Sequence, residues 1–213
     1  MEEFLQAAAV ERQYGHRMTD WGALYAEHVT AIGALAAELS EEQLAVEVPG
    51  TPAWTVRDLL AHLAGGAADV VTGRMDGAPG PEWTARHVGE RLSVPVGGLL
   101  DELADNVEGV ARTTIDNPRP AVVWDIAVHH ADLHEALGLP RLPERLWRPV
   151  AEMVGPWRAA DLVDAVEPYE LFRAVFSRRS RSQLLALGLT ASQADEIGIF
   201  GPRLDDQPVP PAT

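Results

Sequence analysis

The chain has 213 residues, a formal net charge of −15, no cysteine, and arginine at all 17 of its basic positions. Its length fits one ordinary domain with room for a small additional subdomain, and its acidity weighs against a nucleic-acid partner, since phosphate binding requires a concentrated basic face. The missing cysteine excludes disulfides, thiolate zinc sites and a nucleophilic protein thiol, and the missing lysine excludes a Schiff base.

The N-terminal segment, residues 1–17, begins acidic and contains no apolar run long enough for a signal peptide. No segment of the chain approaches the ~20 consecutive apolar residues of a membrane-spanning helix. We therefore expect a cytoplasmic protein without a membrane partner.

Apolar residues recur at spacings of three and four through most of the chain, which predicts a mainly helical protein. A capping box at Ser40 predicts a further short helical turn, and a Pro/Gly cluster at 95–98 could break the third main helix into a pair. In chain order, the expected helices cover residues 18–39, 55–73, 121–137, 146–164 and 168–187. A further long helix, the third in order, is expected between the Gly/Pro loop at 76–81 and about residue 115. Residues 197–200 could add a short edge strand.

Four main helices with short connections predict a bundle, and bundles hold ligand sites among side chains that project inward from facing helices. We expect the bundle to span residues 16–140 and a C-terminal helical extension, residues 141–200, to pack on it. The proline-rich tail, residues 201–213, is expected to be disordered. Polar residues on apolar helix faces are therefore the informative ones.

The fourth expected helix carries a polar stripe along the edge of its apolar face. Asp125, His129 and Asp132 follow i, i+4, i+7 spacing, so they lie on one side of the helix. Burying two carboxylates and an imidazole without partners would cost several kcal/mol. One solution is a divalent cation bound by Asp125 and His129. The other is an internal network in which Asp132 meets an arginine of a neighbouring helix.

His62 lies at the flank of the apolar face of the second expected helix, where it would supply a third ligand. Two histidines and one carboxylate leave coordination positions open, which is typical of a catalytic site and suits zinc, nickel, iron or manganese. His130 and His134 form a second i, i+4 pair, about 100° or more around the helix from the first stripe. We expect this pair to be partly exposed, although it could line the mouth of the site.

Three segments together resemble the mycothiol-dependent maleylpyruvate isomerase family of DinB/YfiT-like metal-binding bundles: Thr51–Gly65, Trp124–Gly138 and Tyr169–Gln183. The resemblance covers roughly residues 16–187. It implies an all-α fold, namely a DinB/YfiT-like four-helix bundle with additional C-terminal helices, and one divalent metal, usually zinc. Matched motif by motif, the metal ligands would be His62, Asp125 and His129. The isomerase itself is similar but has glutamate at the carboxylate position.

The resemblance also suggests roles for neighbouring residues. Asp132 matches a recurrent family aspartate that would orient a ligand histidine, and His130 stands where glutamate or arginine is more frequent, so both are candidate catalytic residues. Arg178 and Arg179 are candidates for binding a carboxylate of the substrate or of the thiol cofactor through bidentate hydrogen bonds. The alternative is that these arginines form salt bridges with the acidic excess. The same two interpretations apply to Arg86, Arg91, Arg173 and Arg181.

The implied chemistry uses a low-molecular-weight thiol such as mycothiol, which a metal converts to the nucleophilic thiolate. It would act on a small electrophilic substrate as an S-transferase or a cis-trans isomerase. We favour S-transfer because the C-terminal part is too short for the full second domain of the isomerase. The alternatives are a non-catalytic metal- or small-molecule-binding bundle, such as a sensor or immunity protein, and a thiol-independent natural-product enzyme. We expect a monomer or a homodimer.

Overall fold

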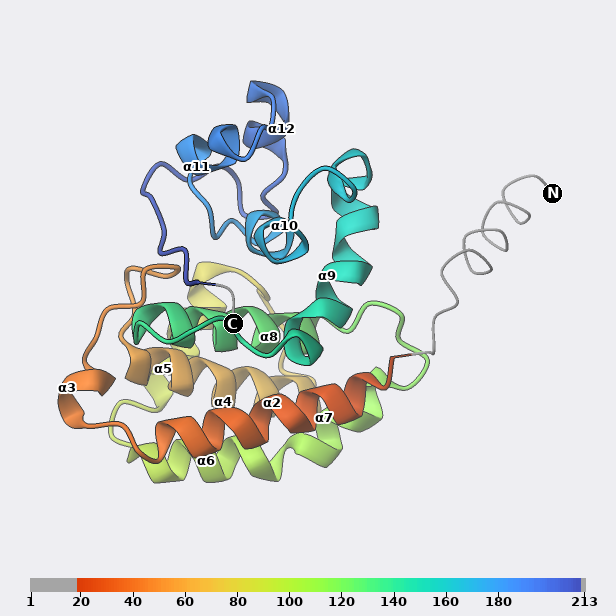
Figure 1. Ribbon diagram of the computed structural model, residues 1–213. Helices are drawn as coiled ribbons and strands as arrows, with labels where there is room; N and C mark the ends of the chain where they lie inside the picture. The colour runs from red at the N-terminus through yellow and green to blue at the C-terminus, as the bar shows by residue number, and fades with distance from the viewer. Residues whose placement is uncertain (1–18, 212–213) are drawn as a thin grey trace.

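The computed structural model describes residues 19–211, and within this range every regular element is a helix. Figure 1 shows helices of the N-terminal part side by side in a bundle, with the C-terminal helices forming a second lobe above it. The bundle contains α2 (Trp21–Ala36), α4 (Val56–Thr72), α6 (Val96–Asp105), α7 (Val107–Thr114) and α8 (Ala121–Ala136). The expected all-α bundle with additional C-terminal helices is therefore confirmed.

Side-chain caps define the starts of α2, α3 (Glu41–Leu44) and α4, the first three helices in the described range. The Asp20 carboxylate accepts a hydrogen bond from the Ala23 amide, so α2 begins at Trp21, and the expected start at residue 18 lies outside the described residues. Ser40 forms the expected capping box at α3, and Thr55 forms a capping box at α4. Gly73, in the left-handed region with φ 76°, ends α4 as expected.

The expected third helix is divided into three: α5 (Pro81–Glu90), α6 and α7. The first interruption lies just before the expected Pro/Gly break, and a second falls at Asn106. Arg57 of α4 explains the first interruption, because its Nη2 donates to the carbonyl oxygens of the linker residues Arg91, Leu92 and Val94. These carbonyl groups thus obtain a partner outside any helix.

The C-terminal lobe contains α9 (Glu144–Arg158), the 3-10 turn Ala160–Leu162, α10 (Pro168–Val175), α11 (Arg181–Ala186) and α12 (Ala191–Glu196). The single helix expected over 168–187 is wrong, since residues 176–180 interrupt it and Ser177 has a φ of 58°. The edge strand expected at 197–200 is also wrong. That segment is a turn, held by hydrogen bonds from the Ile199 amide to the Val175 carbonyl and from the Gly201 amide to the Gly198 carbonyl.

Residues 202–211 form no helix or strand but are held by specific hydrogen bonds, in contrast to the expected disordered tail. Arg203 donates from Nη1 to the carbonyl oxygen of Gly50 at 2.8 Å and from Nη2 to that of Pro49 at 3.1 Å. Gln207 is buried, and its amide donates to Gln183 of α11. These contacts with the loop before α4 and with α11 give the segment partners that its sequence does not reveal.

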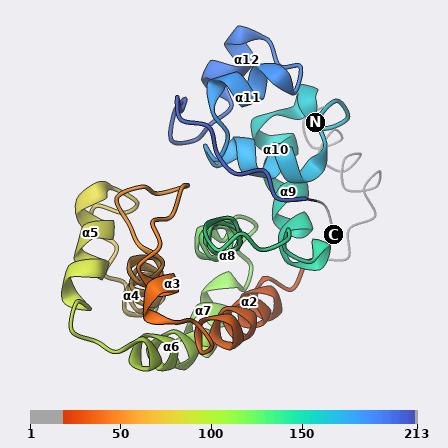
Figure 2. The same cartoon turned by 60° about the vertical axis from the view of Figure 1, so that its left-hand side comes forward.

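Helix α8 lies on the side of the bundle that faces the C-terminal lobe, as Figure 2 shows. It packs against α2 and α4 on one side and against α9 on the other. Burial therefore extends around most of its circumference: Val123, Ile126 and Leu133 are buried, and Val122 is partly buried. In the described range no helix has the length and apolarity required to cross a membrane.

Candidate metal centre

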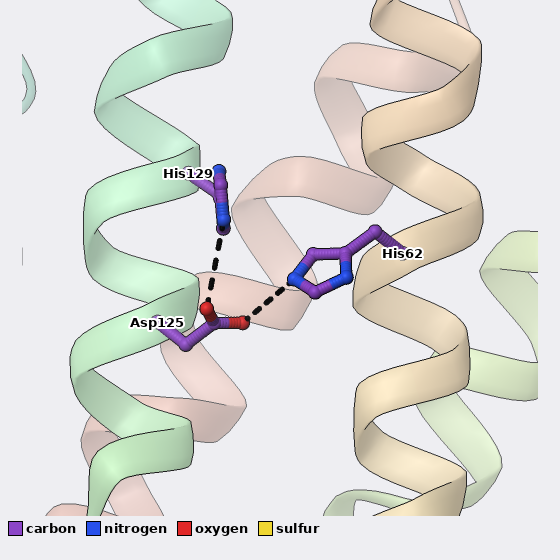
Figure 3. Close-up of side chains that lie close together, drawn as sticks. All are labelled: His62, Asp125 and His129. Atoms are coloured by element: carbon purple, nitrogen blue, oxygen red, sulfur yellow. Dashed lines mark ion pairs between the residues drawn. The ribbon is translucent and has the colours of Figure 1, made fainter. Parts of the chain in front are cut away.

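Three potential metal ligands meet where α4 faces α8. His62 comes from α4, while Asp125 and His129 occupy successive turns of α8, and their ligand atoms all lie within 4.8 Å of one another. Nε2 of His62 lies 3.4 Å from Oδ2 of Asp125, and Nε2 of His129 lies 3.5 Å from Oδ1 of the same carboxylate. Figure 3 shows the two imidazole rings approaching the two oxygens of Asp125 from different sides.

The donor atoms of this cluster fit a divalent cation. Nε2 of His62 is buried and has no hydrogen-bond partner among residues 19–211. Its distance to Asp125 exceeds that of an ordinary N–H···O hydrogen bond, and a buried polar atom without a partner is costly. Two imidazoles and one carboxylate are ligands that zinc and its first-row neighbours accept. We call His62, Asp125 and His129 the ligand cluster.

The electrostatics of the ligand cluster keep its carboxylate ionised and its first histidine neutral. Partial burial acts to raise the pKa of Asp125, but His62, His129 and Arg178 outweigh this effect and lower it to about 2. Burial lowers the pKa of His62, although Asp125 opposes that shift. A neutral imidazole and a carboxylate are the protonation states that bind metals.

Asp132 supports His129 from behind. Its Oδ2 accepts a hydrogen bond from Nδ1 of His129 at 2.9 Å, which leaves Nε2 of His129 free to face Asp125. Burial by itself would raise the pKa of Asp132, but the guanidinium groups of Arg178 and Arg173 hold it well below its usual range. Asp132 is thus a fully buried carboxylate that contacts a candidate ligand without belonging to the ligand cluster.

A second pair of groups lies behind His62. Its Nδ1 is 3.1 Å from Nδ1 of His87, a buried residue of α5. Nε2 of His87 lies 3.0 Å from Oδ2 of Asp69, and Arg86 donates to the same oxygen at 2.6 Å. Sequence reasoning did not single out His87 or Asp69. The available signal was the pair Gly65–Gly66 inside α4, because glycine within a helix marks a close approach by another element.

His130 does not join the ligand cluster. It is 2% exposed and lies at the junction of α8 with α2, where its Nδ1 is 2.9 Å from Nδ1 of His28. Nε2 of His28 in turn donates to the Leu146 carbonyl oxygen at 3.0 Å. The expectation of a partly exposed His130 is therefore wrong. His134 is half-buried, and its Nδ1 donates to the carbonyl oxygen of Pro140 at 2.7 Å.

The two candidate anion-binding arginines are both buried in ion pairs. Arg178 donates from Nη2 to Oδ2 of Asp132 at 3.0 Å, and Arg179 pairs with Glu170 and Glu135. The salt-bridge alternative is therefore the arrangement that the structure shows for them. The remaining arginines considered above also have acidic partners: Arg86 with Asp69, Arg91 with Glu102, Arg173 with Asp132 and Glu135, and Arg181 with Asp195.

A pocket of about 460 Å³ reaches the ligand cluster through Asp125, whose side chain is 40% exposed. Its walls are mostly apolar and include Leu63, Ala67, Val70, Trp83, Val122 and Ile126. Tyr25 also lines the pocket, and burial together with Asp125 raises the pKa of its phenol, so the hydroxyl is protonated. Arg119 is the one cationic side chain among the described residues that line it.

Trp54 lies over the ligand cluster. Its ring centroid is 4.7 Å from that of His62 and 5.8 Å from that of His129. This residue belongs to the loop before α4. The indole contacts both histidines, whereas the pocket reaches Asp125, so the ligand cluster has an apolar cover and an accessible carboxylate.

Comparison with known families agrees with this arrangement. The family model for the mycothiol maleylpyruvate isomerase N-terminal domain matches residues 25–167, which is more than half of the chain and includes the whole ligand cluster. No match was found among curated proteins or among solved structures. The chain belongs to the mycothiol maleylpyruvate isomerase N-terminal domain family.

Proposed function

We propose that this protein is a metal-dependent enzyme that uses a low-molecular-weight thiol of the mycothiol type against a small electrophile. The observation that carries this proposal is the buried Nε2 of His62, which has no hydrogen-bond partner in the described chain and lies beside the Asp125 carboxylate. His62, Asp125 and His129 would hold the divalent cation, and zinc is among the metals that these ligands suit. When bound, such a cation supplies the positive charge that stabilises a thiolate.

The pocket that reaches Asp125 favours a catalytic role for the metal over a role in metal storage. Three protein ligands leave coordination positions open, and the pocket of about 460 Å³ adjoins the carboxylate that would bind the metal. The cysteine-free chain has no thiolate of its own, so an external thiol would supply the nucleophile. Trp54 covers the histidines, and this cover supports a thiol that enters through the pocket.

The lining of the pocket favours S-transfer to an apolar electrophile over isomerisation of a dianionic one. Its walls are mainly aliphatic and aromatic, and Arg119 is the one guanidinium group that lines it in the described chain. Arg178 and Arg179 are paired with buried carboxylates. A substrate with two carboxylates would therefore have one cationic partner and would lie near Asp125, whereas an apolar molecule with at most one anionic group matches the lining.

The proposal is tested by metal binding and by the entry of sulfur into the metal's coordination shell. We expect the wild-type protein to bind one zinc ion per chain, His62→Ala to lose this binding, and the control His134→Ala to retain it. Mycothiol added to the cobalt-substituted protein should produce a thiolate-to-cobalt charge-transfer band. Failure of the wild-type protein to bind zinc, or a cobalt spectrum that mycothiol leaves unchanged, would contradict the proposed function.

A further inference from the structure

We propose that Asp69 and His87 form a hydrogen-bond relay that fixes the tautomer of His62 and thereby directs the lone pair of its Nε2 into the ligand cluster. His87 and Asp69 are positioning residues in this arrangement, because they act through His62. The inference rests on the proposed metal site, but the relay itself is a property of the protein's own hydrogen bonds.

The direction of each hydrogen bond follows from the chemistry of its partners. A carboxylate can only accept, so Nε2 of His87 donates to Oδ2 of Asp69 at 3.0 Å. A neutral imidazole carries one N–H, which leaves Nδ1 of His87 as an acceptor. The N–H at the other end of the 3.1 Å contact must then be on Nδ1 of His62. His62 therefore has its lone pair on Nε2, the atom that lies beside Asp125.

Arg86 explains how Asp69 can orient His87 without making it an imidazolium. Its Nη2 donates to Oδ2 of Asp69 at 2.6 Å, so the charge of the carboxylate is already balanced. His87 is fully buried, and a second positive charge there would lose its hydration without a free anion to compensate. The neutral form of His87 is thus the stable one, as the relay requires.

Packing holds the His87 ring in a single place. A Cβ atom on Gly65 would lie 2.6 Å from Cγ of His87, so the ring occupies space that only glycine leaves open on α4. The Trp83 ring meets it edge-on with 4.1 Å between centroids, and Nη1 of Arg91 donates to the His87 carbonyl oxygen. A ring confined in this way can keep its acceptor aimed at Nδ1 of His62.

The tautomer of His129, the second histidine of the ligand cluster, is also set by a buried carboxylate, in this case through a direct contact. Asp132 contacts Nδ1 of His129 directly at 2.9 Å, while Asp69 reaches His62 through one intervening imidazole. In both cases a buried carboxylate sets which nitrogen carries the proton, and in both cases Nε2 faces Asp125. The longer route also ties the ligand on α4 to α5, which holds His87.

Nuclear magnetic resonance of the metal-free protein tests the relay directly. In wild-type protein with ¹⁵N-labelled histidine, we expect the proton of His62 on Nδ1 and that of His87 on Nε2. His87→Leu removes the acceptor, so His62 should no longer be held in the Nδ1–H form. His87→Asn is the matched control, because its side-chain oxygen can accept the same hydrogen bond and should preserve the tautomer.

Metal affinity, measured by competition with a chromophoric chelator for zinc, gives the second readout. We expect His87→Leu to bind zinc about 10- to 100-fold more weakly than wild type and His87→Asn to recover most of that loss. A wild-type His62 with its proton on Nε2, or equal zinc affinity in the Leu variant and wild type, would overturn the relay. Wild-type protein with the expected tautomers but no zinc binding would instead overturn the proposed function and leave the relay supported.

Discussion

The carboxylate of Asp132 accepts a hydrogen bond from Nδ1 of His129 at 2.9 Å while it neutralises two arginines of the C-terminal part of the chain. Arg173 comes from α10, and Arg178 lies in the non-helical segment, residues 176–180, that follows this helix. One buried residue of α8 therefore connects a candidate metal ligand with the C-terminal lobe.

Replacing Asp132 should destabilise the whole protein. In Asp132→Ala, the buried guanidinium groups of Arg173 and Arg178 would lose a counter-charge, and removing one partner of a buried ion pair costs about 3–5 kcal/mol. Denaturation by urea measures the free energy of unfolding. The control is Glu108→Ala, which breaks an exposed pair with Arg112 and should change stability by less than about 0.5 kcal/mol. Equal losses in the two variants would contradict this account of Asp132.

The two adjacent glycines of α4 should respond differently to alanine. A Cβ on Gly65 would lie 2.6 Å from Cγ of His87, so Gly65→Ala should destabilise the protein by about 1–3 kcal/mol. A Cβ on Gly66 would have its nearest neighbours at 3.9 Å, so Gly66→Ala should be neutral or stabilising by up to about 1 kcal/mol, because alanine favours the helix. Thermal unfolding of both variants tests this contrast, and a stable Gly65→Ala protein would refute the close approach of His87.

Stability should fall as the solution is acidified, partly because of His28. Burial lowers the pKa of this residue from 6.5 to about 4, although its bond to Leu146 and the charge of Glu27 oppose the shift. Below pH 6.5 the unfolded chain therefore binds a proton that the folded chain refuses, which removes up to about 1.4 kcal/mol of stability per pH unit. His130, whose pKa burial lowers to about 2, acts in the same direction.

His28→Gln should make this dependence shallower, because glutamine can donate to Leu146 and accept from His130 but does not titrate. The measurement is the free energy of unfolding as a function of pH. We expect the variant's slope between about pH 6 and pH 4.5 to be smaller by about 1 kcal/mol per pH unit, with parallel curves above about pH 7.5. Identical slopes at acid pH would show that His28 is not held neutral by the fold.

Filling the pocket should separate electrophile binding from metal binding. Val122 lines the pocket and is not a member of the ligand cluster, so Val122→Trp should occupy the cavity and leave zinc affinity unchanged. Conjugation of mycothiol to 1-chloro-2,4-dinitrobenzene should lose about 10-fold or more in kcat/KM. Leu92→Trp, at a position that is 68% exposed, is the control. Unchanged kcat/KM in Val122→Trp would place the electrophile elsewhere.

Helix starts with a side-chain cap could be predicted from local sequence. Ser40 forms the expected capping box at α3, and Thr55, Ser180 and Thr190 form capping boxes of the same spacing at the starts of α4, α11 and α12. The interruption before α11 could not be predicted in this way. It depends on Ser177, whose positive φ accompanies a hydrogen bond from its Oγ to the Gly201 carbonyl, 24 residues later.

The same distinction applies to the candidate site: some of its residues could be predicted from local spacing, and others depend on tertiary packing. Asp125, His129 and Asp132 could be predicted to share one side of a helix because their spacing is local. The partners of His87 and Arg178 could not, since they depend on how α5 packs against α4 and on where the chain turns after α10. Arg178 illustrates the difficulty: a guanidinium suited to a substrate carboxylate is equally suited to Asp132.

The ion pairs of α8 also determine which fragments of this protein would keep its buried charges balanced. The family match ends at residue 167, before Arg173, Arg178 and Arg179, the cations that neutralise Asp132 and Glu135. A fragment cut at that boundary would retain two buried carboxylates and lose their counter-ions. The part of the chain that matches the family is therefore too short to supply the counter-ions of α8. Because these arginines are synthesised after residue 167, we expect the candidate site to fold only once the C-terminal lobe has been made.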